Sequence, residues 1–144
     1  MNWQKEAISD LNCYLARKNS ILVMQEKIKE LRAKEERLKS SGNTTPVQGG
    51  SSKSEDMIIN CIIECDHLKE NIIAISRWLA LFERGLKTLT EDERVVLDKF
   101  YINRPTRHID RLCDELHYEK TRIYEIKDIA LRKFTLSRYG ILEL

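Results

Sequence analysis

The sequence has little glycine or proline, no long run of apolar residues and almost no net charge. Five glycines and two prolines among 144 residues leave little room for long irregular segments. No apolar run approaches the roughly 20 residues that a membrane-spanning helix requires. The N-terminus also lacks the basic and then apolar layout of a signal peptide. We therefore expect a cytoplasmic protein without a membrane partner.

The charge balance gives no strong indication of a partner. The 25 basic and 23 acidic side chains give a formal net charge of +2, which is too small to attract nucleic acid or an anionic membrane by itself. Any nucleic-acid site must therefore come from a local arrangement of basic residues.

Sequence motifs for catalysis are missing. The chain has no glycine-rich phosphate loop, no H-E-x-x-H sequence and no nucleophile elbow, so we expect neither an enzyme nor a cofactor. Cys61 and Cys65 are four residues apart, as are Cys113 and His117, and the two pairs together could in principle form a zinc site. Free cysteines more often fill buried helix positions, and we expect no metal.

Hydrophobic periodicity predicts an all-α protein. Apolar residues recur every three or four positions over residues 3–39 and again, more densely, over 55–84. Residues 40–54 between them are rich in Ser, Thr and Gly and predict a flexible linker. We interpret residues 1–84 as a first domain, a long antiparallel, coiled-coil-like helical hairpin. The wide apolar face of its second helix predicts that the chain dimerises through this hairpin.

Residues 85–144 predict a second, helix-turn-helix domain. We expect Gly85 to end the long second helix, and Thr90 with Glu93 to form a capping box that starts a short one. Thr106 is placed to cap another short helix, and a longer helix should run over residues 119–137. Two short helices, a tight turn and a longer helix are typical of helix-turn-helix units, including winged-helix-like ones.

The helix over residues 119–137 has two distinct faces. Ile123, Ile126, Ala130 and Phe134 share one face and should pack against the preceding helices. The N-terminal part of the opposite face would enter the major groove of double-stranded DNA if this is a recognition helix. The candidates for base readout are Lys120, Thr121, Tyr124 and Glu125. The candidates for phosphate contacts are Arg107, Arg122, Lys127 and Arg132.

Three segments of this second domain resemble region 4 of bacterial sigma factors, which reads the promoter −35 element. They are LTEDERVVL at residues 89–97, IDRLC at 109–113 and TRIYEIKDIALRKF at 121–134. Nearly the whole chain, including the linker TPVQGG at 45–50, resembles phage-encoded transcriptional regulators of the ArpU and RinA type. Glu125 departs from the sigma pattern, in which a basic residue is usual near this position.

The resemblance implies a sequence-specific activator of late phage or prophage genes. Such a protein would bind DNA in the nucleoid of the host bacterium, as a dimer, and act with host RNA polymerase. Two other functions remain open. The first is an adaptor that binds RNA polymerase or a sigma factor through the hairpin and does not bind DNA. The second is a small terminase subunit, which would bind DNA as a ring.

Overall fold

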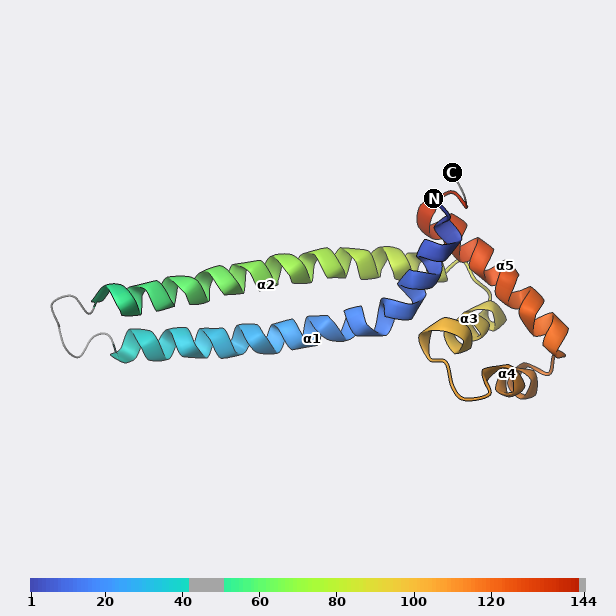
Figure 1. Ribbon diagram of the computed structural model, residues 1–144, viewed down its shortest axis with the longest axis horizontal. Coiled ribbons are helices and arrows are strands. Elements are labelled where there is room, and N and C mark those ends of the chain that lie inside the picture. The colour runs from blue at the N-terminus through green and yellow to red at the C-terminus, as the bar shows by residue number, and fades with distance from the viewer. Residues whose placement is uncertain (42–50, 143–144) are drawn as a thin grey trace. The chain divides into compact units, whose positions relative to one another are not determined.

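The computed structural model describes residues 1–41 and 51–142, with only the backbone of Ser51 and Ser52 (Figure 1). These residues form helices and contain no β-strand, so the all-α prediction is confirmed and the described chain has no β-wing. Among them, no helix is both long and apolar enough to cross a membrane. The helices are α1 (Trp3–Ser41), α2 (Ser51–Leu86), α3 (Glu91–Leu97), the π-helical turn η1 (Asp98–Ile102), α4 (His108–Leu116) and α5 (Lys120–Tyr139).

The two long helices extend further than the sequence predicted. Residues 40–41 continue α1 and residues 51–54 belong to the first turn of α2, so the predicted linker over 40–54 was too long. Serine is tolerated at helix ends because its hydroxyl can bond to the backbone there, and Ser41 Oγ lies 3.3 Å from the carbonyl oxygen of Leu38. The remainder of the predicted linker, residues 42–50, lies outside the described residues.

The chain divides into two compact units, and both long helices contribute to each. The smaller unit is Lys18–Arg77, and the larger unit combines Met1–Arg17 with Trp78–Leu144. This division follows packing contacts, whereas the predicted boundary between residues 84 and 85 follows the change in sequence composition. The difference arises because the first residues of α1 and the last residues of α2 pack in one core with α3 and α5.

In the smaller unit, α1 and α2 lie side by side and run in opposite directions (Figure 1). The more buried residues recur at alternating spacings of three and four along each helix, which is the pattern of a coiled-coil seam. On α1 these residues are Ile21, Met24, Ile28, Leu31, Glu35 and Leu38. On α2 they are Ile58, Cys61, Cys65, Leu68, Ile72 and Ile75.

Aromatic side chains centre the core of the larger unit. The ring of Phe82 stacks on Tyr14 with centroids 4.4 Å apart and meets the edge of Phe134 at 5.1 Å. Gly85 was predicted to end α2, but the helix continues to Leu86. Because Gly85 has no side chain, the Phe134 ring can instead pack close to the backbone of α2.

Thr90 caps the start of α3 as predicted, but the Glu93 carboxylate bonds to the Thr90 hydroxyl and not to its backbone N–H as in a full capping box. The backbone N–H of Glu93 donates to Thr90 Oγ1, which in turn donates to Glu93 Oε1 at 3.1 Å. The same carboxylate oxygen accepts from Lys133 Nζ of α5 at 2.8 Å. The predicted cap Thr106 was wrong, because α4 begins one residue later, after Arg107 in a left-handed conformation (φ 56°).

The two ends of the described chain are joined in the larger unit. The backbone N–H of Trp3 donates to the carbonyl of Leu142 at 2.9 Å, and the Trp3 and Tyr139 rings lie 4.8 Å apart. The Tyr139 hydroxyl donates to the carboxylate of Asp10, a residue that is itself buried. These contacts fasten the start of α1 to the C-terminal end of α5.

Candidate nucleic-acid interface

Helix α5 buries the face that the sequence predicted. Ile123, Ile126, Ala130 and Phe134 are all buried, the first two against α3 and α4 residues and the last two in the aromatic core. Only His117, Tyr118 and Glu119 separate α4 from α5, and His117 is left-handed (φ 61°), with its N–H bonded to Cys113. This short connection fixes the direction in which α5 leaves α4.

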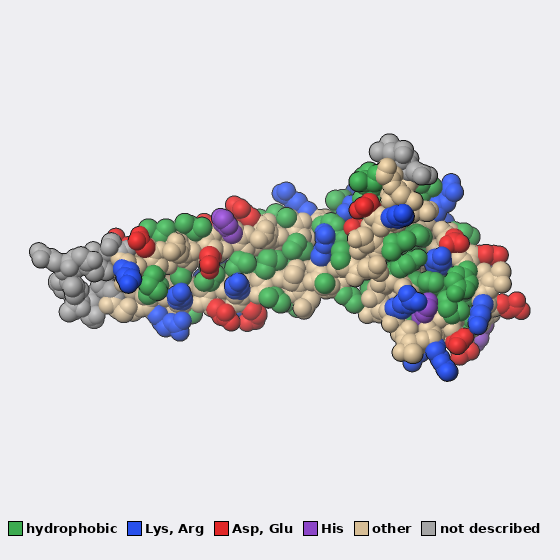
Figure 2. Space-filling view, in the orientation of Figure 1, with side chains coloured by type: hydrophobic (Ala, Val, Ile, Leu, Met, Phe, Trp, Pro, Cys, Tyr) green, Lys and Arg blue, Asp and Glu red, His purple; other side chains and the backbone are tan. Residues whose placement is uncertain are grey.

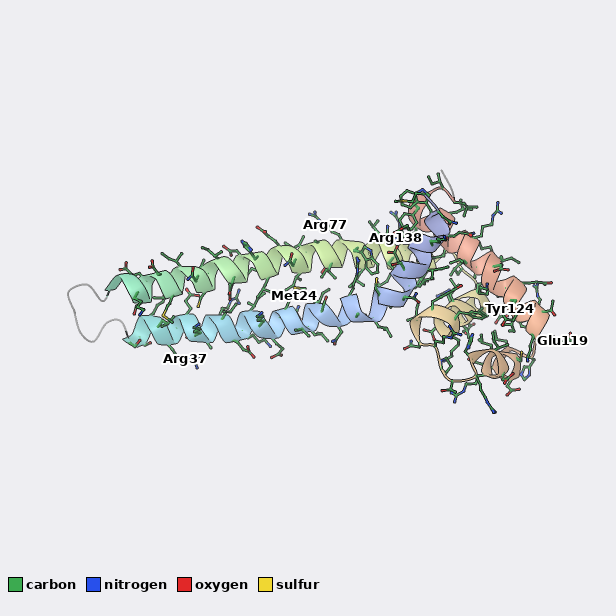
Figure 3. The ribbon with its side chains drawn as sticks, in the orientation of Figure 1. Met24, Arg37, Arg77, Glu119, Tyr124 and Arg138 are labelled. Carbon is green, nitrogen blue, oxygen red and sulfur yellow. The ribbon has the colours of Figure 1, made fainter. Side chains whose placement is uncertain are left out.

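The four side chains predicted to read bases are all exposed. Lys120 and Thr121 occupy the first turn of α5, and Tyr124 and Glu125 the second. Figure 3 shows Glu119 and Tyr124 at the N-terminal end of this helix and Arg138 near its other end. Within the described residues, each of the four side chains therefore has surface open to solvent.

An aromatic cluster holds the N-terminal end of α5 against η1 and α4. The Phe100 ring meets the edges of His108 at 4.9 Å and Tyr124 at 5.9 Å. Partial burial, and then the charge of Arg104, lower the pKa of His108, which favours the neutral imidazole in this apolar setting. Because Tyr124 packs on this cluster, its ring has a defined place beside the exposed face.

Lys127 extends from α5 across the same cluster. Its Nζ lies 5.8 Å from the Phe100 centroid and 2.8 Å from Asp128 Oδ1. Partial burial acts to lower the pKa of Lys127, but the hydrogen bond to Asp128 and nearby tyrosines outweigh it and raise the pKa. The side chain is therefore a fixed positive charge at the rim of the exposed face.

The first turn of α5 is basic, although the residue before it, the N-cap Glu119, is acidic. It carries Lys120 and Arg122 and no acidic residue, although the partial positive charge at a helix N-terminus favours carboxylates. The contrast with α3 is clear, because the first turn of α3 contains Glu91, Asp92 and Glu93. Basic side chains at a helix start cost about 0.3–1 kcal/mol each, and an anion bound there would remove this cost.

The basic residues of α5 nearest the exposed face have acidic neighbours. Arg122 forms an ion pair with Glu125 at 3.1 Å, and Lys120 Nζ lies 4.0 Å from Asp110 of α4. All four side chains are more than half exposed. Exposed pairs of this kind contribute only about 0–1 kcal/mol, so a phosphate can displace the carboxylates at little cost.

Three exposed arginines lie before and within α4, and the sequence predicted a phosphate contact only for Arg107. Arg104, Arg107 and Arg111 are exposed, and none forms an ion pair with any residue that the structure describes. The contact between Lys120 and Asp110 places this end of α4 beside the first turn of α5. The spacing of these arginines along the sequence gave no signal, because residues 103–107 are not helical and Arg107 is left-handed.

The remaining predicted phosphate contact, Arg132, lies apart from this group. It is exposed but two to three turns further along α5 than Arg122. Arg122 and Lys127 therefore lie on α5 within about two turns of the four base-reading candidates, Arg107 lies just before α4, and Arg132 lies further toward the C-terminal half of α5.

The residues considered for a zinc site belong to different units. Cys61 and Cys65 are buried in the smaller unit, and Cys113 and His117 lie at the end of α4 in the larger one. Within residues 1–41 and 51–142, no three His, Cys, Asp or Glu side chains are grouped to hold a metal ion.

These features define an all-α protein with a mixed-charge, partly aromatic surface at the N-terminal end of its last helix. The chain belongs to the family described as "Protein of unknown function (DUF1492)", whose model matches residues 37–135. The match covers all of α2 to α4 and α5 as far as Thr135. No curated protein and no solved structure matches the chain.

Proposed function

We propose that this protein is a sequence-specific, DNA-binding transcriptional regulator of phage or prophage genes. Helices α4 and α5 would act as a helix-turn-helix unit, with α5 as the recognition helix in the major groove. The resemblance to sigma factor region 4 and to ArpU and RinA regulators supports late genes as the target. The same resemblance supports action with host RNA polymerase.

The observation that carries the proposal is the basic first turn of α5. Acidic residues at its start stabilise a helix, yet the first turn of α5, which follows the N-cap Glu119, holds Lys120 and Arg122 and no acidic residue. Residues that break a local rule of this kind are expected where they serve binding. A phosphate or a base edge near this turn would meet both the side chains and the unpaired N–H groups of the helix.

The positions of the other side chains divide the contacts into two groups. Lys120, Thr121, Tyr124 and Glu125 lie on the exposed face at the groove-entering end and would contact base edges. Lys can donate to guanine and Glu can accept from the amino group of cytosine. Arg104, Arg107 and Arg111 are exposed before and within α4 and would contact phosphates, together with Arg122 and Lys127.

The long helices supply the second part of the proposal. We interpret residues 18–77 as a coiled-coil-like hairpin through which two copies of the chain associate. A dimer would present two recognition helices, and half-sites near one helical turn, about 34 Å, apart would then be expected if both lie on one DNA face.

Selection of DNA from the source genome tests the function directly. Sheared genomic DNA is captured on the purified full chain at physiological salt with excess nonspecific competitor, and the bound fragments are sequenced. We expect enrichment of one or a few intergenic fragments, and loss of that enrichment with Lys120→Ala, because a base contact contributes about 1–3 kcal/mol. A folded protein that enriches no fragment would contradict the proposal.

A second function is favoured by a different observation. The smaller unit exposes several large apolar side chains on α2, as a protein-binding surface does. An adaptor that binds RNA polymerase or a sigma factor through this hairpin, without binding DNA, would use such a surface. It would show neither the genomic enrichment nor a steep dependence of binding on salt.

A further inference from the structure

Four isoleucines of α2 lie exposed on one side of the helix. Ile59, Ile62, Ile63 and Ile73 are between 42% and 53% exposed, far more than an isoleucine in a packed interface. At 100° per residue they fall within an arc of about 100°. We call this surface the α2 stripe. Its centre lies more than about 100° around the helix axis from Cys61 and Cys65, and Ile62 at its edge is about 60° from Cys65. The exposure of all four side chains shows that α1 does not cover them.

The α2 stripe is acidic as well as apolar. Asp66 and Glu70 lie in the same arc, between Ile63 and Ile73. Over residues 51–77 the acidic side chains outnumber the basic ones. The acidic residues are Glu55, Asp56, Glu64, Asp66 and Glu70, and the basic residues are Lys53, Lys69 and Arg77. Any protein that covers this stripe should therefore be basic and carry some apolar side chains of its own.

The α1 part of the same unit has the complementary character. Residues 18–41 contain seven basic and four acidic side chains. Leu22 and Val23, both largely exposed, add apolar surface to this segment. Figure 2 shows the resulting mixture of hydrophobic, basic and acidic side chains on the visible side of the two helices. One chain thus carries both the acidic, apolar stripe and the basic surface that would complement it.

We propose that the α2 stripe is the dimer interface and that it packs against the α1 segment of a second copy. Under two-fold symmetry each stripe covers the other copy's α1, so both stripes are buried in one reciprocal contact. This inference rests on the dimer of the proposed function and specifies which face forms it. The acidic side chains of the stripe then meet basic residues such as Lys29 and Arg37, and the contact should weaken as salt is added.

Sedimentation equilibrium of the full chain without DNA provides the test. We expect a dimer at micromolar concentration, and a dissociation constant raised about tenfold or more by Ile59→Lys with Ile63→Lys. Asn60→Lys with Asn71→Lys, which adds the same two charges at exposed positions of α2 outside the stripe, should leave the constant unchanged. Helical circular dichroism, measured on every variant, shows that each remains folded.

Charge reversal identifies the partner helix. We expect a chain with Asp66→Lys and Glu70→Lys, and a second chain with Lys29→Glu and Arg37→Glu, each to dimerise weakly alone and to form a mixed dimer together. If stripes packed on each other instead, the second chain would dimerise as the wild type does, and the proposal would be wrong. A wild-type dimer unaffected by the isoleucine variants would also overturn this face while leaving the dimer in place. A monomeric wild type would overturn both the face and the dimer, whereas genomic DNA selection tests the recognition helix separately.

Discussion

Gly85 of α2 lies directly against the ring of Phe134 in α5. A Cβ atom at position 85 would be 3.1 Å from Cε2 and 3.3 Å from Cδ2 of that ring, which is closer than ordinary van der Waals contact. Phe134 is fully buried and meets Phe82 on another side, so it has little room to move. The absence of a side chain at position 85 therefore sets how closely α2 and α5 pack in the larger unit.

Gly85→Ala should lower the free energy of unfolding by about 1–2 kcal/mol, because it overpacks this contact. Helix propensity alone predicts the opposite, a gain of up to about 1 kcal/mol from alanine within a helix. Urea denaturation of the full chain decides between the two effects. If the variant is more stable than the wild type, the Phe134 ring yields easily and the packing argument is incorrect.

His117→Gly should raise the stability of the fold by about 0.5–1 kcal/mol. His117 ends α4 in a left-handed conformation, which costs residues other than glycine energy that glycine does not pay. The side chain is exposed, so its removal loses little packing. Thermal unfolding measures the change, with the exposed Glu115→Ala of the same helix as the control. A lower melting temperature for the glycine variant would show that the imidazole has a structural role.

The sequence predicted the features that depend on local chemistry. The cap that Thr90 forms with Glu93 follows from the spacing of two residues, and the buried face of α5 follows from helical periodicity. Both are confirmed. The extent of the long helices and the role of Gly85 could not be predicted, because they depend on tertiary contacts. Glycine at the end of an apolar run usually ends a helix, whereas the position of Phe134 shows that Gly85 makes room for a packed ring.

Prediction of the candidate interface had a similar limit. The exposed positions of Lys120, Thr121, Tyr124 and Glu125 were predicted from a single helical face. The pairing of Lys120 with Asp110 and the packing of Tyr124 on Phe100 join residues that are distant along the chain. Arg104 and Arg111 were missed because their relation to α5 arises only when the chain folds.

Tyr139→Phe should destabilise the protein by about 1–2 kcal/mol near neutral pH, since it removes a hydrogen bond to the buried carboxylate of Asp10. Partial burial, and then the bond to Asp10, raise the pKa of Tyr139 above its ordinary value of 10.0. The folded chain holds the Tyr139 proton more tightly than the unfolded chain does. The contribution of this hydrogen bond to the free energy of unfolding is therefore fully present below pH 10 and is lost as the pH rises further. The difference in stability between wild type and Y139F should therefore shrink in alkaline solution. Denaturant curves measured at several pH values above and below 10 test this, and a constant difference would contradict the assignment.

Removal of single arginines should change the salt dependence of DNA binding in a way that distinguishes phosphate contacts from structural effects. If Arg104, Arg107 and Arg111 each contact one phosphate, replacement by glutamine should reduce the slope of log K against log salt concentration by about 0.9 per residue. The ratio of affinities for a selected fragment and for random DNA should stay the same, since phosphate contacts carry no sequence information.

Arg94 is exposed on α3 and serves as the control, because R94Q should leave the slope unchanged. Fluorescence anisotropy over a series of salt concentrations measures both quantities. Equal slopes for the wild type and all three variants would show that these arginines do not contact phosphates. A variant that loses its preference for the selected fragment over random DNA would instead assign that arginine to base readout.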